Sequence, residues 1–201
     1  MTDLRNTPVA PSQAAPFAIR AERASDVAQR EALLDACFGE NRQMRTCQRL
    51  RDGRTPAEGL SLSAVRKGRV VGTVRLWHVS AGGIPALILG PLAVEQSCRK
   101  LGVGAALMAR ALAAAMERGH RAVILLGDAP YYARFGFSTA KTADLILPGS
   151  FERERLLGLE LQDGALDGAW GMVVPTGAAE AKGVRGGKAV RKSARLVAQA
   201  V

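Results

Sequence analysis

A pair of glycines at the start of a predicted helix constrains this chain more than any other feature. The stretch RKLGVGAAL (99–107) places Gly102 and Gly104 between an almost wholly apolar segment, 86–94, and an alanine-rich segment, 105–118. The first predicts a strand that is covered on both faces, and the second predicts a helix. The first N–H groups of a helix have no partners within it, and glycine lets a ligand approach them closely. Because such a helix end attracts anions, the stretch predicts a phosphate-binding loop.

The identity of the phosphate is not fixed by this stretch alone. A dinucleotide-binding loop would need a third glycine, where Leu107 stands, and a tight turn, whereas 95–101 separate the strand from the first glycine. No further strand–helix–strand units follow, although Asp128 lies near the distance expected of a ribose-binding acid. A P-loop is excluded because no Gly-Lys-Ser/Thr sequence closes the motif. Another pyrophosphate, or no phosphate at all, stays open at this point.

Two motifs at compatible spacing carry a resemblance to a known family. Arg-x-x-Gly-x-Gly, which starts at Arg99 after a strand ending at 92–94, resembles the acetyl-CoA pyrophosphate signature of the GCN5-related N-acetyltransferases (GNAT). Further on, YYARFGF (131–137) resembles the Tyr-x-x-x-Gly-Phe element of that family. The phrases LGPLAV and GDAPYYARFGF resemble in particular a bacterial subgroup of predicted N-acetyltransferases. The resemblance covers roughly 17–174.

The resemblance implies an α/β (α+β) fold with a central mixed, mostly antiparallel sheet that is flanked by helices. It also implies a splay between the fourth and fifth strands, which we match to 86–94 and 121–126. Backbone groups of the fourth strand would bind the pantetheine arm as an added strand would, and the loop would bind the pyrophosphate. The residues assigned to acetyl-CoA in this way are Leu92, Ala93, Val94, Arg99, Lys100, Leu101, Gly102, Val103, Gly104 and Ala105.

The resemblance also implies a chemistry, in which an amine attacks the thioester directly and a tyrosine protonates the leaving thiolate. Tyr132 matches the motif tyrosine and receives this role, with packing against the cofactor as the alternative. Many members of the family carry a glutamate on the fourth strand as the base, but here that strand has no acid before Glu95. Asp128, Glu95 and His78 are the candidates that remain, and we place Asp128 first. A proton path through water would need none of them.

Apolar periodicity predicts the other elements. Residues 60–65 and 69–79 predict a hairpin, with Val70, Val74, Leu76 and His78 on one face of its second strand. Elsewhere, short strands are expected at 145–147 and 168–174, separated by a loop. Helices are expected at 27–38, which follows a short apolar segment at 17–21, and at 41–51 and 131–135.

The formal net charge of +10 raises the question of a nucleic-acid partner. Residues 178–201 contain six basic residues against one acid, and a second cluster of five arginines lies within 42–54. A solvated surface explains both clusters. The alternative is contact with RNA or a ribosome through the tail, although the tail has no aromatic residue on which a base could stack.

Composition divides the chain into three parts and indicates a compartment. We expect a mobile arm at 1–16, one catalytic domain at 17–175 and a basic, disordered tail at 176–201. The N-terminal residues contain no apolar core of signal-peptide length, no later apolar run approaches the length of a membrane span, and the three cysteines show no metal-binding spacing. These features predict a cytoplasmic protein without a metal or a membrane partner. Pairing of edge strands near the C-terminus into a homodimer is left open.

The sequence therefore predicts an acetyl-CoA-dependent N-acetyltransferase whose acceptor is an amine. Two alternatives remain: a basic nucleic-acid- or ribosome-associated binding protein, and a CoA-binding fold of the same type without catalysis. The acceptor itself is not specified, and its pocket is expected in 41–54 and 148–168.

Overall fold

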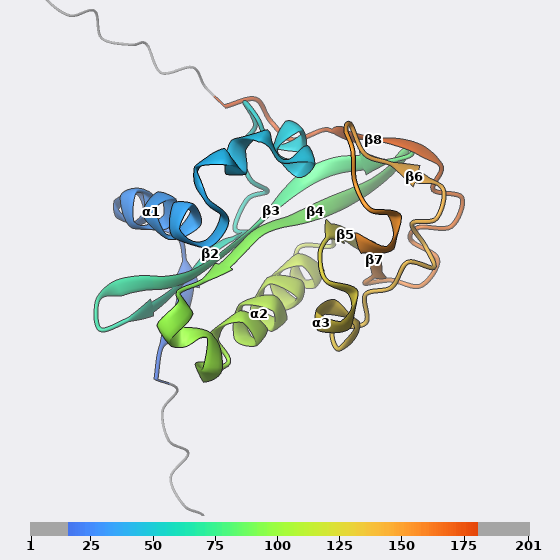
Figure 1. The fold of residues 1–201 in the computed structure, drawn as a ribbon. Helices are drawn as coiled ribbons and strands as arrows, with labels where there is room; N and C mark the ends of the chain where they lie inside the picture. The colour runs from blue at the N-terminus through green and yellow to red at the C-terminus, as the bar shows by residue number, and fades with distance from the viewer. Residues whose placement is uncertain (1–15, 181–201) are drawn as a thin grey trace, which may run out of the picture.

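A long antiparallel strand pair, β3 and β4, runs through the middle of the fold (Figure 1). The structure is a computed structural model and describes residues 16–180. β3 (Arg69–Ala81) and β4 (Ile84–Val94) are joined by Gly82 and Gly83, whose φ angles are 57° and 93°. A two-residue hairpin turn of this kind requires positive φ at both positions, which glycine adopts without strain.

The other strands extend this pair into an eight-stranded sheet with the order β1-β2-β3-β4-β5-β7. All neighbours in this order are antiparallel except β4 and β5, which are parallel. β8 pairs with the end of β3 and, in parallel, with β6. The expected mixed, mostly antiparallel sheet is therefore confirmed. These strands are β1 (Ala18–Ala21), β2 (Ser61–Arg66), β5 (Ala122–Leu126), β6 (Leu145–Ile146), β7 (Leu156–Glu160) and β8 (Gly171–Pro175).

Two helices cover opposite faces of the sheet (Figure 1). α2 (Val103–Glu117) packs Leu107 and Met108 into a core that includes Leu76 of β3. α1 (Val27–Phe38) packs its buried leucines against Val70 and Ala93 on the other face. Shorter helical turns connect these elements, namely η1 (Ala24–Asp26), η2 (Glu40–Met44), η3 (Thr46–Leu50), η4 (Gln96–Leu101), α3 (Ala129–Ala133) and η5 (Arg153–Arg155).

Two predicted elements differ from the structure. The expected loop after 147 contains β7, whose Leu156 and Leu157 are buried because the strand pairs with β5. The helix expected at 41–51 is two 3-10 turns, since Arg45 between them has extended backbone angles. β7 forms because it pairs with a strand that is distant in sequence, and the predicted helix is divided by a single extended residue. The local pattern of apolar residues predicts neither feature.

A bulge in β3 also corrects the predicted face of Val70. The register of β2 and β3 shifts so that Val71 is an extra residue. Val71 consequently packs with Val74 and Leu76 beneath α2, whereas Val70 packs against α1. Strict alternation along a strand fails wherever a bulge inserts one residue.

The feature that positions the site is the separation of β4 from β5. The two strands pair only at Leu87 with Val123 and at Ile88 with Ile124. Just beyond, Gly90 and Pro91 together oppose a single residue of β3, so β4 bulges and turns away. The expected splay between the fourth and fifth strands is confirmed. Among the strands of residues 16–180, none pairs with the β5-facing edge of β4 after Ile88.

The structure describes five residues beyond 175, where we expected the catalytic domain to end. Thr55 N–H donates to Ala178 O at 2.9 Å, and Glu180 N–H donates to Gly53 O at 2.8 Å. These bonds attach 176–180 to the segment after η3. The predicted arm, except Pro16, and the basic residues of the predicted tail lie outside the described residues.

A buried carboxylate fixes the start of α1. Asp26 accepts hydrogen bonds from Arg20 Nη2 (2.8 Å), Arg23 N–H (2.9 Å) and Ser63 Oγ (3.2 Å), which joins α1 to β1 and β2. The Arg20 hydrogen bond is the main reason that the pKa of Asp26 lies well below its usual range. Since the far end of α1 lines the pocket described below, this contact supports one wall of it.

Asp26→Asn should lower the free energy of unfolding at neutral pH by about 2–4 kcal/mol, because it leaves partly buried donors without a carboxylate. A carboxyl with a lowered folded-state pKa stabilises the fold above its unfolded pKa and loses this effect as the pH falls below about 4. Urea unfolding should therefore show the difference between wild type and variant shrinking from about pH 6 to about pH 3. Glu117→Gln, which removes an exposed partner of Arg110, is the control and should cost less than about 1 kcal/mol. Equal costs, or an Asp26 effect that does not change with pH, would contradict this role.

Candidate active site

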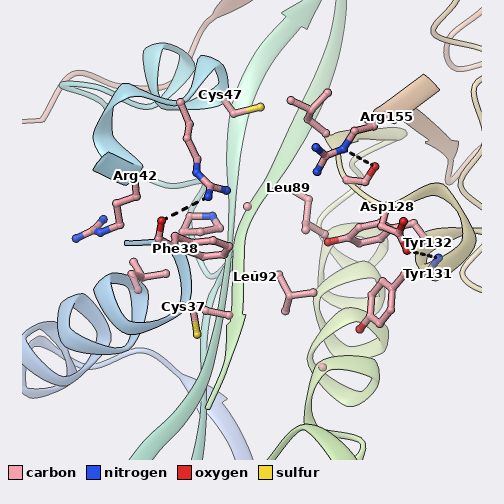
Figure 2. A pocket seen from close by; sticks show the side chains of 18 of the residues that line it. Cys37, Phe38, Arg42, Cys47, Leu89, Leu92, Asp128, Tyr131, Tyr132 and Arg155 are labelled. Atoms are coloured by element: carbon pink, nitrogen blue, oxygen red, sulfur yellow. Dashed lines mark hydrogen bonds between the residues drawn. The ribbon is translucent and has the colours of Figure 1, made fainter. Parts of the chain in front are cut away.

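A pocket of about 1080 Å³ opens along β4 where that strand leaves β5. Figure 2 shows Cys37 and Phe38 of α1 on one side of it and Tyr131 and Tyr132 of α3 on the other. Its lining also includes residues of η2 and η3, the start of α2, the end of β5, and Ser150, Phe151, Glu152 and Arg155. The pocket is large enough for a cofactor arm together with a second ligand.

One end of the pocket is the N-terminus of α2. Gly102, the residue before the helix, has a left-handed conformation with φ of 76°. A Cβ atom at Gly104 would lie 2.8 Å from the Tyr131 hydroxyl oxygen, so a larger residue would displace that ring. The exposed side chains of Arg99 and Lys100 line the same end. Free helix N–H groups and two cations form a site suited to phosphate oxygens.

The structure brings together most of the residues that the sequence assigned to acetyl-CoA. Leu101 and Val103 are the two that do not line the pocket: Leu101 faces solvent, and the side chain of Val103 lies in the core beneath α2. Cys98 is also buried in that core, which agrees with a thiol that takes no part in the site. The eight that line the pocket are Leu92, Ala93, Val94, Arg99, Lys100, Gly102, Gly104 and Ala105.

The two tyrosines point in different directions. Their rings meet edge to face with centroids 4.9 Å apart. In Figure 2 the Tyr131 hydroxyl points towards α2, and the Tyr132 hydroxyl points across the pocket towards Leu89 of β4. A Cβ atom at Gly127 would lie 2.2 Å from the Tyr132 ring, which therefore packs directly on the backbone after β5.

Burial changes the acidity of Tyr132. It raises the pKa of the phenol to about 12, helped by Tyr131 and by the carboxylate of Asp128, while Arg155 opposes the rise. Tyr132 therefore holds its proton at neutral pH and is available as a hydrogen-bond donor inside the pocket.

Of the three candidate bases, only Asp128 lines the pocket. Its carboxylate accepts the N–H of Tyr131 at 3.3 Å and so caps α3, but it is otherwise exposed. Glu95 lies outside the lining and 4.0 Å from Arg69. His78 stands beside His120, with ring centroids 5.3 Å apart, and neither lines the pocket.

The end of the pocket farthest from α2 contains arginines that sequence reasoning did not assign to a site. Arg51 of the segment after η3 donates from Nε to Cys47 O at 3.0 Å, and Arg155 donates from Nε to Gly127 O at 3.4 Å. Both line the pocket. Arg51 belongs to the cluster that was interpreted as a solvated surface. The signal that could have identified these arginines was the expectation that 41–54 and 148–168 form the acceptor pocket.

Contacts between those two segments close this end. Thr46 Oγ1 donates to Ser150 O, and Arg49 Nη1 donates to Pro148 O at 2.7 Å. Cys47 lies next to Thr46 on the η3 side of the pocket. Burial raises the pKa of its thiol, although the charges of Arg51 and Arg155 act to lower it.

Within residues 16–180, no helix is long and apolar enough to cross a membrane, and no group of His, Cys, Asp and Glu side chains is arranged to hold a metal ion.

Comparison with known proteins agrees with this geometry. Residues 27–137 match the model of the acetyltransferase (GNAT) family. The protein named Uncharacterized N-acetyltransferase YhbS of Escherichia coli (strain K12) is 31% identical over 157 residues, which cover 77% of this chain and 93% of that protein.

Two solved structures are similar. The E. coli GNAT family N-acetyltransferase YhbS in complex with CoA matches with a TM-score of 0.69 and 30% identity, covering 84% of this chain and 94% of that chain. A GNAT family acetyltransferase from Brucella melitensis in complex with acetyl-CoA matches in fold, with a TM-score of 0.57 and 24% identity over 84% of this chain and 97% of that chain. By its sequence and its fold, this chain belongs to the acetyltransferase (GNAT) family and is an acyltransferase.

Proposed function

We propose that this chain transfers the acetyl group of acetyl-CoA directly to the nitrogen of an amine. One observation carries the proposal: an unpaired edge of β4 leads from the glycine-opened end of α2 to the hydroxyl of Tyr132, within one pocket. A similar protein with 30% identity has been solved in complex with CoA, which supports the same use of the pocket here.

The pocket offers a separate partner to each part of the cofactor. The pyrophosphate would bind the N–H groups at the start of α2, next to Arg99 and Lys100. Peptide groups of Leu92, Ala93 and Val94 would hydrogen-bond the pantetheine arm in place of the missing strand. The acetyl thioester would then lie near Tyr132.

The chemistry requires two proton movements. The amine nitrogen attacks the carbonyl carbon, a C–N bond forms, and the C–S bond breaks with its electron pair on sulfur. Tyr132 donates its proton to that sulfur and regains one from solvent, while the attacking nitrogen loses one. Asp128 is the proposed acceptor of the amine proton, directly or through a water molecule, because it is the candidate base that lines the pocket.

Gly104→Glu should abolish binding of acetyl-CoA, because it places a carboxylate where phosphate oxygens belong and displaces Tyr131. Ala109→Glu is the matched control, since it adds the same charge at an exposed position of the same helix. Isothermal titration with acetyl-CoA should give wild-type affinity for the control and no detectable binding for the Gly104 variant. Circular dichroism of both variants would show that they are folded. Binding by Gly104→Glu within threefold of wild type, a threshold of about 0.7 kcal/mol, would refute the phosphate site.

Tyr132→Phe should lower kcat by about 100-fold and leave the affinity for acetyl-CoA nearly unchanged, because it removes the proton and preserves the ring. Tyr131→Phe is the control and should change kcat less than threefold (~0.7 kcal/mol). Since the pKa of Tyr132 is raised to about 12, wild-type kcat should show no loss from phenol ionisation between about pH 7 and about pH 10.

The same pH series on Asp128→Asn tests the base, because asparagine also caps a helix but accepts no proton. The variant should lose about tenfold or more in kcat at neutral pH, with most of the loss recovered as the amine deprotonates at high pH. Unchanged turnover in Tyr132→Phe or Asp128→Asn would remove that residue from its role. Absence of turnover in the wild type with any amine would favour a CoA-binding fold without catalysis.

A further inference from the structure

Positive charge lines the pocket beyond its phosphate end as well. Among the side chains that the structure describes, seven basic ones line it against two acidic ones, Asp128 and Glu152. Arg99 and Lys100 lie at the phosphate end, and Arg134 lies over the Tyr131 ring, 4.1 Å from its centroid. The other four are Arg42, Arg45, Arg51 and Arg155.

These four arginines differ in how their charge is compensated. Arg42 is paired with Glu31 and, from Nε at 2.6 Å, with Asp35. Arg45 is exposed and lies over the Phe38 ring, 5.0 Å from its centroid. The other two arginines, Arg51 and Arg155, come from opposite walls of the pocket.

Arg51 is a half-buried cation that forms no ion pair with the described side chains, which are those of residues 16–180 except Glu40. Its Nε donates to Cys47 O, and its sequence neighbour Asp52 accepts instead from Gln48 Nε2 at 2.6 Å. Burial lowers the pKa of the Arg51 guanidinium, which shows how poorly the charge is solvated. An uncompensated charge taken out of water costs free energy that an anionic ligand would offset.

Arg155 is held beside the reacting centre. Its Nε donates to Gly127 O, and its charge acts on both Tyr132 and Cys47. Its Nη1 lies 3.8 Å from Glu152, and with side chains 47% and 65% exposed that pair is weak. Figure 2 shows Arg155 and Cys47 on opposite sides of the same end of the pocket.

Arg51 lies away from the proposed phosphate site. A Cβ atom at Gly90 would lie 3.7 Å from Arg51 Nη1, so the guanidinium lies against the bulge of β4. The strand from Gly90 to Val94, next to the phosphate site, spans up to about 13 Å. Arg51 and the cations at the start of α2 therefore lie at opposite ends of this stretch of strand.

We infer that the acceptor is an amine that also carries an anionic group, a carboxylate or a phosphate, held between Arg51 and Arg155. This inference rests on the proposed function. The anion lies on the two guanidiniums, and the amine points towards the thioester near Tyr132. Amines that carry only positive charge, such as diamines, are disfavoured by the same two cations.

The test follows CoA release with three sets of acceptors at saturating acetyl-CoA. Amino acids are compared with their amides, phosphoethanolamine is compared with ethanolamine, and putrescine represents cationic amines. The member of at least one pair that carries the anionic group should have a kcat/KM at least tenfold (~1.4 kcal/mol) above the partner that lacks it, and the pair that responds identifies carboxylate or phosphate. Amines without an anionic group, or putrescine, turned over as well as the anion-bearing amines would overturn the inference.

Arg51→Met should raise KM for the preferred acceptor by about 10- to 100-fold and leave KM for acetyl-CoA within threefold, and Arg51→Lys should restore part of the loss. Arg69→Met, at an exposed arginine outside the pocket, is the control.

If no acceptor is turned over, titration of the CoA-saturated protein with inorganic phosphate and with acetate tests the anion site instead. Saturable binding that Arg51→Met removes supports the anion site, and equal behaviour of Arg51→Met and wild type refutes it. Failure of acetyl-CoA itself to bind refutes the proposed function instead.

Discussion

The rest of the site depends on the unpaired edge of β4. A strand inside a sheet normally satisfies its N–H and C=O groups on both sides, and leaving them without partners in a buried place is costly. Here pairing with β5 stops at Ile88, and the bulge at Gly90 and Pro91 turns the strand away. The helix that follows starts at the end of this free edge, and α3 starts at the end of β5. One divergence of two strands thus places a backbone edge, a helix N-terminus and a tyrosine around one pocket.

Cationic groups line both ends of that pocket. Helix N–H groups, Arg99 and Lys100 define one end, and Arg51 and Arg155 define the other. Between them stand the backbone of β4 and the buried phenol of Tyr132, whose raised pKa reflects a poorly solvated place. Such a place suits a thioester, which is neutral, and it strengthens the hydrogen bond that a phenol gives to developing negative charge. In the proposed function, the first end binds the cofactor phosphates and the second binds the acceptor.

Local signals allowed much of this structure to be predicted. A Gly-x-Gly pair before an alanine-rich helix and a tyrosine before Gly-Phe are contiguous in sequence, and both lie in the pocket where expected. Features that arise from distant pairing were not predictable. β7 is recognisable only through β5, and the bulge at Val71 leaves no mark on the alternation of β3. Arg51 and Arg155 lie far apart in sequence, so their shared pocket follows from contacts such as Arg49 with Pro148.

Hydrogen–deuterium exchange with and without acetyl-CoA tests most directly whether the free edge of β4 binds the cofactor. We expect peptides covering 89–94 and 102–106 to exchange more slowly in the presence of acetyl-CoA, because their free N–H groups would acquire partners. Peptides of the β1–β2 pair, which lie away from the pocket, should exchange as before. Unchanged exchange at 89–94, with protection confined to other segments, would contradict the account.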